Sequence, residues 1–283
     1  MSGTAAYQVD VGDLTRTYLL RVPHTRPGGF RRIFGFPLVI ILHGSGATGE
    51  TVEAMSRMDS MAEARRFVVA YPDATTGAFG LRSDWNAGQC CGIAARNNVD
   101  DVAFIRSLID SVAARIRVDR NRIYVAGFSD GARMTYRAAC ELSAEIAAIA
   151  VVSGSLTDAH CVPQRPVPLI AFHGTADDEV AFDDSAYTAP PAAPLTSAAN
   201  LPPAIRFWSA VNQCKGVTRT RQAPHVTEAQ FDGCAADVMF YTIEGGLHAW
   251  PGGAADGDNG AEPTGEIFAS REAIRFFFHH PKP

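Results

Sequence analysis

The segment "RIYVAGFSDGARMTYRAACEL", residues 122–142, places the pentapeptide G-F-S-D-G between a hydrophobic run and a helical pattern. This strand–turn–helix context is that of a nucleophile elbow, where a serine stands on a turn too tight for a neighbouring Cβ. A single G-x-S-x-G is a weak signal, and its context makes it specific. The segment predicts Ser129 as a nucleophile. It also predicts that the N–H of Asp130, at the start of the next helix, donates to a developing oxyanion.

A serine hydroxyl becomes a good nucleophile only when a base removes its proton, so a histidine and an orienting acid are expected as well. On this type of fold they follow in the order Ser, Asp or Glu, His, each on a loop after a strand. "VPLIAFHGTADDEV" places Asp177 and Asp178 beyond one strand, and "VMFYTIEGGLHAWPGG" places His248 beyond the last one. We predict His248 as the base and Asp177 as the acid, with Asp178 as the alternative acid.

The segment "PLVIILHGSGATGE", residues 37–50, has two incompatible interpretations. Its tail spells G-x-G-x-x-G, and Asp73 follows near the spacing of a ribose-binding carboxylate, which is typical of a dinucleotide site. An "LHGSG" loop after an early strand is also where the second oxyanion donor is expected. The polar residues that follow do not suit a tightly packed dinucleotide-binding helix. We therefore expect the N–H of Ser45, or of Gly46, to face a carbonyl oxygen, and we expect no cofactor.

Strand-like runs alternate with helical patterns along the chain, which predicts an α/β fold with a mostly parallel sheet and helices on both faces. The first strand is expected to be antiparallel to its neighbour. We expect one domain over residues 1–283, with a flexible tail at 1–6 and a long Ala-, Pro- and Ser-rich loop at 183–203. The predicted strands are 16–23, 37–44, 67–73, 122–129, 146–154, 167–174 and 237–246, and the predicted helices are 98–116, 130–143, 202–213 and 266–279.

Composition excludes several classes of protein. A net charge of -5 without a dense basic run argues against a nucleic-acid partner. No apolar stretch approaches the roughly 18 to 20 residues of a membrane span, and no signal peptide is visible at the N-terminus. The six cysteines form no C-x-x-C pair and have no histidine at ligand spacing, so no metal is expected. Their even number favours disulfides, and hence a secreted or periplasmic protein, over six reduced thiols.

Several motifs in order resemble the polyhydroxybutyrate depolymerase and feruloyl esterase family of α/β-hydrolases, from about residue 18 to residue 278. The resemblance implies an ester hydrolase with Ser129, His248 and Asp177 as its triad and with no metal or organic cofactor. Its substrate would be a small, oligomeric or polymeric ester: feruloyl or acetyl esters of plant polysaccharide, or alternatively 3-hydroxybutyrate polyester. A peptidase, an acyltransferase and an NAD-binding oxidoreductase also stay open as activities. The motifs are "PLVIILHG", "VAYPDA", "WNAGQCCG", "NVDDVAFI", "IYVAGFSDGARM", "HGTADDEV", "FWSAVNQC" and "YTIEGGLHAWPG".

The resemblance also implies a disulfide between Cys214 and Cys234. Cys90 and Cys91 would then pair with Cys140 and Cys161, in an order that the sequence does not assign.

Three side chains beside the predicted site are expected to influence which substrate binds. Trp85 and Trp250 could each stack on an aromatic or sugar group, or could instead pack the loops around the site. Asp130 places a carboxylate next to the nucleophile, where its charge is expected to disfavour anionic acyl groups.

Overall fold

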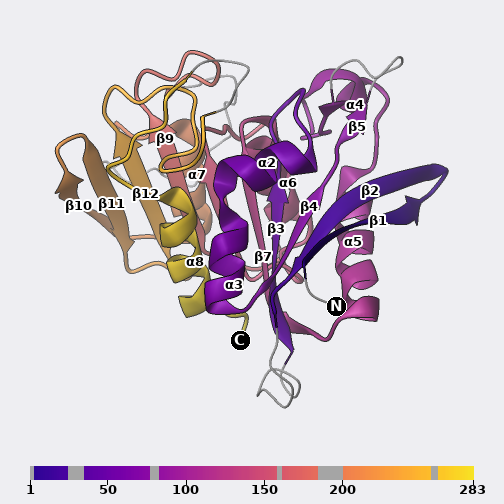
Figure 1. The fold of residues 1–283 in the computed structure, drawn as a ribbon. Helices are drawn as coiled ribbons and strands as arrows, with labels where there is room; N and C mark the ends of the chain where they lie inside the picture. The colour runs from indigo at the N-terminus through magenta and orange to yellow at the C-terminus, as the bar shows by residue number, and fades with distance from the viewer. Residues whose placement is uncertain (1–2, 25–34, 77–82, 158–160, 184–199, 256–260) are drawn as a thin grey trace.

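One ten-stranded sheet runs through the computed structural model, which describes residues 3–24, 35–76, 83–157, 161–183, 200–255 and 261–283. Its six central strands are parallel, and an antiparallel pair extends each edge (Figure 1). In spatial order the strands are β1 (Gly3–Val11), β2 (Leu14–Val22), β4 (Val68–Pro72), β3 (Phe36–Leu42), β7 (Val118–Phe128), β8 (Ala148–Val152), β9 (Leu169–Gly174), β12 (Val238–Ile243), β11 (Val226–Asp232) and β10 (Gly216–Ala223). A small separate ribbon joins β5 (Thr75–Thr76) to β6 (Ser83–Asp84).

Helices cover both faces of the sheet (Figure 1). Alternate residues of one strand serve the two sides: Val39 and Ile41 pack in one core cluster and Ile40 in the other. Burial on both faces explains why the central strands read as continuous hydrophobic runs. The predicted α/β-hydrolase fold is confirmed. One face of the sheet carries α2 (Gly49–Ser56), α3 (Met58–Arg65) and α8 (Ala269–His279). The other face carries α5 (Asp101–Arg115), α6 (Asp130–Glu141) and α7 (Pro203–Val211). The short helix α4 (Gly92–Arg96) lies beside β5 and β6.

The predicted elements are present, and the structure adds several that the sequence pattern does not announce. β2 is antiparallel to both of its neighbours, as expected for the first predicted strand. The predicted flexible tail at 1–6 is wrong for residues 3–6, because they pair with β2 as part of β1. In the predicted 183–203 loop, residues 184–199 lie outside the described residues, and Pro203 already begins α7.

The carboxyl ends of the parallel strands bring the predicted site together. β3 and β7 are neighbours in the sheet, and the loops that follow them carry residues 43–46 and Ser129. Ligands of open α/β sheets bind at this kind of edge, where the strand order reverses. Gly131 allows the close approach, since a Cβ there would overlap the carbonyl oxygens of Leu42 and His43.

Three disulfides join all six cysteines, and two of the three implied pairings are wrong. Cys214 bonds to Cys234, as the family resemblance implies. Cys90 and Cys91 were expected to pair with Cys140 and Cys161, but Cys90 bonds to Cys91 and Cys140 bonds to Cys161. Within the described ranges, no helix has both the length and the hydrophobicity to cross a bilayer.

Candidate active site

Ser129 stands on a strained turn between β7 and α6. Its φ of 55° and ψ of -118° lie where side chains other than glycine are rare, and such strain is typical of functional positions. Its N–H donates to Val152 O at 3.1 Å, and its carbonyl accepts from the N–H groups of Ala132 and Arg133. The predicted strand–turn–helix elbow is therefore present.

His248 and Asp177 form a buried pair beside this turn. The Nδ1 atom of His248 lies 2.9 Å from both carboxylate oxygens of Asp177. With the carboxylate on that side, Nδ1 carries the proton and donates it, which leaves Nε2 as the basic nitrogen. Ser129 and His248 line one cavity of about 170 Å³. Of the two acids considered, Asp178 is exposed, and the buried Asp177 is the one that contacts Nδ1 of His248.

The hydrogen bonds around Asp177 keep its carboxylate ionised. Burial alone would raise the pKa of Asp177, but hydrogen bonds from His173, His248 and the Val180 N–H outweigh it, and the pKa lies well below its usual value. His173 Nε2 lies 3.4 Å from Asp177 Oδ2 and donates to Val180 O at 2.7 Å. His173 is thus a supporting residue that the sequence pattern does not reveal.

The loop after β3 is held by a second buried histidine. His43 donates from Nδ1 to Gly44 O at 2.7 Å and accepts from the Ala74 N–H at Nε2, 2.9 Å away. Burial lowers the pKa of His43, which favours this neutral form. A Cβ on Gly44 would lie 3.2 Å from the Cβ of Ser129, so the loop runs directly against the nucleophile.

The alternative oxyanion donor of this loop is engaged within the protein, because the N–H of Gly46 donates to Ser83 O at 2.8 Å. Ser45 stays the predicted donor. The Ser45 hydroxyl donates to the carboxylate of Asp84, and this bond fixes the loop from its other side.

The groups that a dinucleotide would use are occupied by the protein itself. Asp73 accepts from the Gly49 N–H at 2.8 Å and from Thr17 Oγ1 at 2.7 Å. Thr48 caps the same helix start through the Thr51 N–H. The last glycine of the G-x-G-x-x-G motif therefore begins a capped helix. Neither the glycine motif nor Asp73 supports the dinucleotide interpretation, because both make contacts within the protein.

The carboxyl group of Asp130 is buried and is hydrogen-bonded to the backbone of Trp85. Its Oδ2 accepts from the Trp85 N–H at 2.7 Å, and its Oδ1 has no hydrogen-bond partner among the described residues. Burial raises the pKa of Asp130 to about 7, against opposing effects of that hydrogen bond and of Arg133. We expected Asp130 to repel anionic acyl groups, and this expectation is wrong. The carboxyl group of Asp130 is buried and is only partly ionised near neutral pH.

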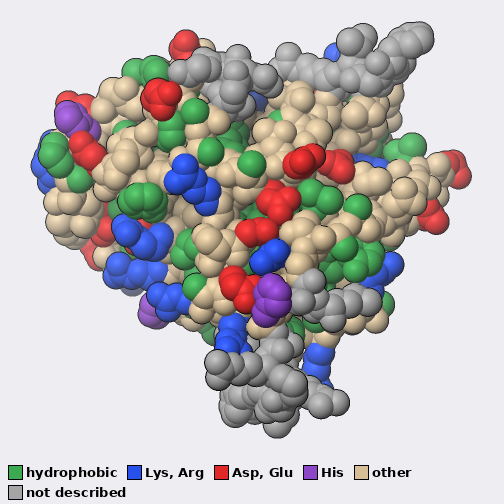
Figure 2. Space-filling model, in the orientation of Figure 1, with side chains coloured by type: hydrophobic (Ala, Val, Ile, Leu, Met, Phe, Trp, Pro, Cys, Tyr) green, Lys and Arg blue, Asp and Glu red, His purple; other side chains and the backbone are tan. Residues whose placement is uncertain are grey.

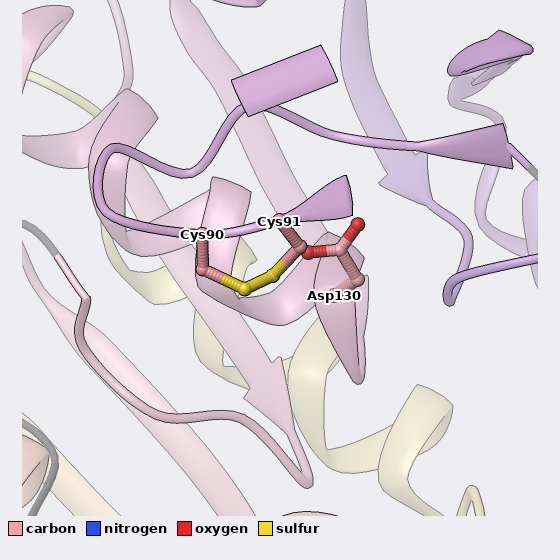
Figure 3. A group of neighbouring side chains, drawn as sticks. All are labelled: Cys90, Cys91 and Asp130. Carbon is pink, nitrogen blue, oxygen red and sulfur yellow. A yellow bond between two sulfur atoms is a disulfide. The ribbon is translucent and has the colours of Figure 1, made fainter. Parts of the chain in front are cut away.

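Asp130 also belongs to a cluster of potential metal ligands with Cys90 and Cys91 (Figure 3). The two sulfur atoms are bonded to each other beside the carboxylate. Metal ions bind thiolates, and a disulfide offers none. In its oxidised form the cluster is thus a structural contact between the loop before α4 and the elbow.

Neither predicted tryptophan is available to stack on a substrate, which corrects that interpretation. Trp85 is fully buried, packs against Phe104 and donates from Nε1 to His43 O at 2.9 Å. Trp250 is 1% exposed and donates to Ser270 Oγ at 3.0 Å. Both indole N–H groups have a partner inside the protein, and these hydrogen bonds hold the rings in the loops around the site. The second role considered for them, loop packing, is the one observed.

Comparison with known proteins finds esterases among the relatives of this chain. The chain is 30% identical over 266 residues to the putative esterase NocK of Nocardia uniformis, with 88% of this chain and 75% of that protein covered. It is 31% identical over 232 residues to feruloyl esterase B of Piromyces equi, with 79% of this chain but 41% of that protein covered.

Among solved structures, the acetyl xylan esterase from Aspergillus awamori superposes with a TM-score of 0.67 at 15% identity, covering 97% of this chain and 99% of that one. The feruloyl esterase module from Clostridium thermocellum gives 0.60 at 14% identity, covering 99% and 89%. These two likenesses show the fold. Residues 20–194 match the family described as esterase PHB depolymerase. The chain therefore belongs to the esterase PHB depolymerase family, a family of ester hydrolases with the α/β-hydrolase fold.

Proposed function

We propose that the protein is a serine carboxylesterase that works through an acyl-enzyme. The observation that carries this proposal is the pair of 2.9 Å contacts from His248 Nδ1 to Asp177, beside a strained Ser129 in the same cavity. This arrangement supplies a nucleophile, a base that acts through Nε2, and a carboxylate that fixes the tautomer.

The proposed reaction has two halves. Ser129 Oγ attacks the ester carbonyl while His248 Nε2 takes its proton, and Asp177 stabilises the imidazolium. The N–H groups of Ser45 and Asp130 donate to the oxyanion of the tetrahedral intermediate. Its collapse breaks the bond to the alcohol, which leaves with the proton from His248. Water, deprotonated by the same nitrogen, then attacks the acyl-serine and releases the acid.

We propose soluble feruloyl- or acetyl-type esters of plant polysaccharide as substrates. The support is the feruloyl esterase relative and a cavity whose apolar side includes Val52, Met55 and Phe128. A second candidate, 3-hydroxybutyrate polyester or its oligomers, is favoured by the description of the matched family. Comparing kcat/KM for methyl ferulate and for a 3-hydroxybutyrate trimer distinguishes them: the proposal expects the ferulate to be preferred, and preference for the trimer would replace it.

The mechanism is tested with Ser129→Ala on 4-nitrophenyl acetate. We expect kcat to fall by about three to six orders of magnitude, because the nucleophile acts together with its base and acid. Circular dichroism of the variant controls for folding. A folded variant that retains the parent rate would contradict the proposal.

The three disulfides support a location in an oxidising compartment, secreted or periplasmic. We expect titration of the denatured, unreduced protein with a thiol reagent to find no free thiol. Neither nucleic acid nor a membrane is expected as a partner. The face in Figure 2 carries both acidic and basic side chains, and neither kind fills it.

A further inference from the structure

A second and larger cleft adjoins the active-site cavity at the carboxyl ends of β3 and β4. It has a volume of about 560 Å³, and Ala47, in the loop after β3, lines both this cleft and the cavity of Ser129. Its other walls include the start of β2, residues 73–76 after β4, and the first turn of α2. We call it the β2–β4 cleft. Because the two hollows share Ala47, a substrate too long for the active-site cavity has this cleft within reach.

The lining of the β2–β4 cleft combines hydroxyl groups with aliphatic side chains. Leu14 is 44% exposed, and Leu19 also contributes to the lining. A sugar ring carries the complementary groups, with hydroxyl groups around its edge and C–H groups on its two faces. Apolar walls with a few placed polar groups are typical of small-molecule sites. Six of the described lining residues bear a hydroxyl group: Thr15, Thr17, Thr48, Thr75, Thr76 and Ser83.

The polar groups of the cleft are biased towards hydrogen-bond acceptors. The hydroxyl groups of Thr15 and Thr17 each donate to an aspartate at 2.7 Å, so these oxygens keep only their lone pairs for a ligand. The exposed carboxylate of Glu50 can only accept. In the part of the chain that the structure describes, neither the Glu50 nor the Thr76 side chain has a hydrogen-bond partner. The lining therefore suits a ligand that brings its own donors.

The one cation among the described lining residues is engaged inside the protein. Arg16 is buried, its Nη1 lies 2.8 Å from Asp101 Oδ1, and its Nη2 donates to Asp73 O at 3.1 Å. The cleft thus offers little to an anionic ligand. A polyester chain carries carbonyl acceptors and no donors between its ends, whereas each free hydroxyl group of a saccharide is a donor. The saccharide fits this lining better.

We propose that the β2–β4 cleft is a saccharide-binding subsite, which holds sugar residues of the alcohol part while the ester is bound at Ser129. The inference rests on the proposed function, because it assigns the part of the substrate that lies beyond the active-site cavity. Glu50 and Thr76 bind hydroxyl groups of the sugar, and Leu14 packs against a C–H face. Esters borne on a saccharide are then preferred to esters of a small alcohol.

The test compares a feruloylated arabinoxylan trisaccharide with methyl ferulate, which share the acyl group and differ in the alcohol. Glu50→Ala and Thr76→Val should each lower the ratio of kcat/KM for the saccharide ester to that for methyl ferulate about three- to tenfold, because each removes a hydrogen bond to the sugar. Thr220→Val is the matched control, since it makes the same change at an exposed position of β10, at the far edge of the sheet. It should leave the ratio unchanged.

A 3-hydroxybutyrate trimer distinguishes the other occupant. Its kcat/KM relative to that for 4-nitrophenyl acetate should be unchanged in Glu50→Ala, and a fall equal to that of the saccharide ester would assign the cleft to a polyester instead. An unchanged saccharide ratio in both cleft variants, or an equal fall in Thr220→Val, would overturn the inference and leave the proposed esterase intact. Failure of the unmodified protein to hydrolyse the saccharide ester while it hydrolyses methyl ferulate or 4-nitrophenyl acetate would do the same. Failure to hydrolyse any of these esters would overturn the proposed function.

Discussion

Replacing Asp130 by Asn should make the protein more stable at alkaline pH and leave it almost unchanged in acid. Asn is nearly isosteric with a protonated carboxyl, and its side-chain oxygen can still accept from the Trp85 N–H. The pKa of Asp130 rises from an ordinary 3.8 to about 7, with burial as the main cause. The folded state therefore binds more protons than the unfolded state between these values. Its stability falls as the pH rises through this window, and the loss is complete above pH 7.

The size of the effect follows from the same two values. At about 1.4 kcal/mol for each pKa unit, the gap between 3.8 and about 7 corresponds to at most about 4 kcal/mol. Urea unfolding followed by tryptophan fluorescence at pH 5 and pH 8.5 measures it. We expect the free energy of unfolding of Asp130→Asn, relative to the unmodified protein, to rise by about 2 to 4 kcal/mol between these pH values. The exposed Asp178→Asn serves as the control and should show almost no such rise. A pH-independent difference for Asp130→Asn would refute the reasoning.

Three further changes test other parts of the architecture. Asp177→Asn should lower kcat on 4-nitrophenyl acetate by about four orders of magnitude with the fold intact, because the imidazole then adopts the wrong tautomer; a loss below tenfold would contradict the assigned role. The double replacement Cys140→Ser and Cys161→Ser removes a disulfide that joins cysteines with a sequence separation of 21. It should lower the free energy of unfolding in urea by about 3 kcal/mol, and an unchanged value would contradict a stabilising role of this disulfide. Gly131→Ala places a methyl group against carbonyl oxygens at the end of β3 and should lower the thermal midpoint strongly. Gly265→Ala meets nothing within 4 Å and should leave the midpoint nearly unchanged; equal effects of the two glycine changes would contradict this explanation.

The buried half of the fold could be predicted from the sequence, and the exposed half could not. Strands such as β8 are buried along their whole length, so their hydrophobic runs are visible in the sequence. β10 is mostly exposed and polar, and β11 alternates only weakly, so neither gives a hydrophobic run. Their pairing depends on register with β12, which is a non-local property. α2 likewise begins with polar residues that cap it, and a capped start resembles a loop in sequence.

The candidate site divides in a similar way. Ser129, Asp177 and His248 could be found because each follows a buried strand in a fixed order. The contacts that Glu179 and His173 make in the loop of Asp177 could not be predicted, because they depend on how that loop folds back over the acid. The pairing of Cys90 with Cys91 also depends on the local conformation of the chain and not on spacing. The burial of Trp85 and Trp250 could not be predicted either, because it depends on which residues distant in the sequence pack against each ring.

Trp85 is buried beneath the site and forms hydrogen bonds to both segments that carry the proposed oxyanion donors. Its backbone N–H donates to the carboxyl of Asp130, and its indole N–H donates to the carbonyl of His43. The ring of His43 in turn donates to Gly44 O, beside the Ser45 N–H. The Trp85 ring is fully buried, and its hydrogen bond to the His43 carbonyl holds that carbonyl in place. The distance between the two donors is thereby set by a buried network, and a preorganised pair of donors is what oxyanion stabilisation requires.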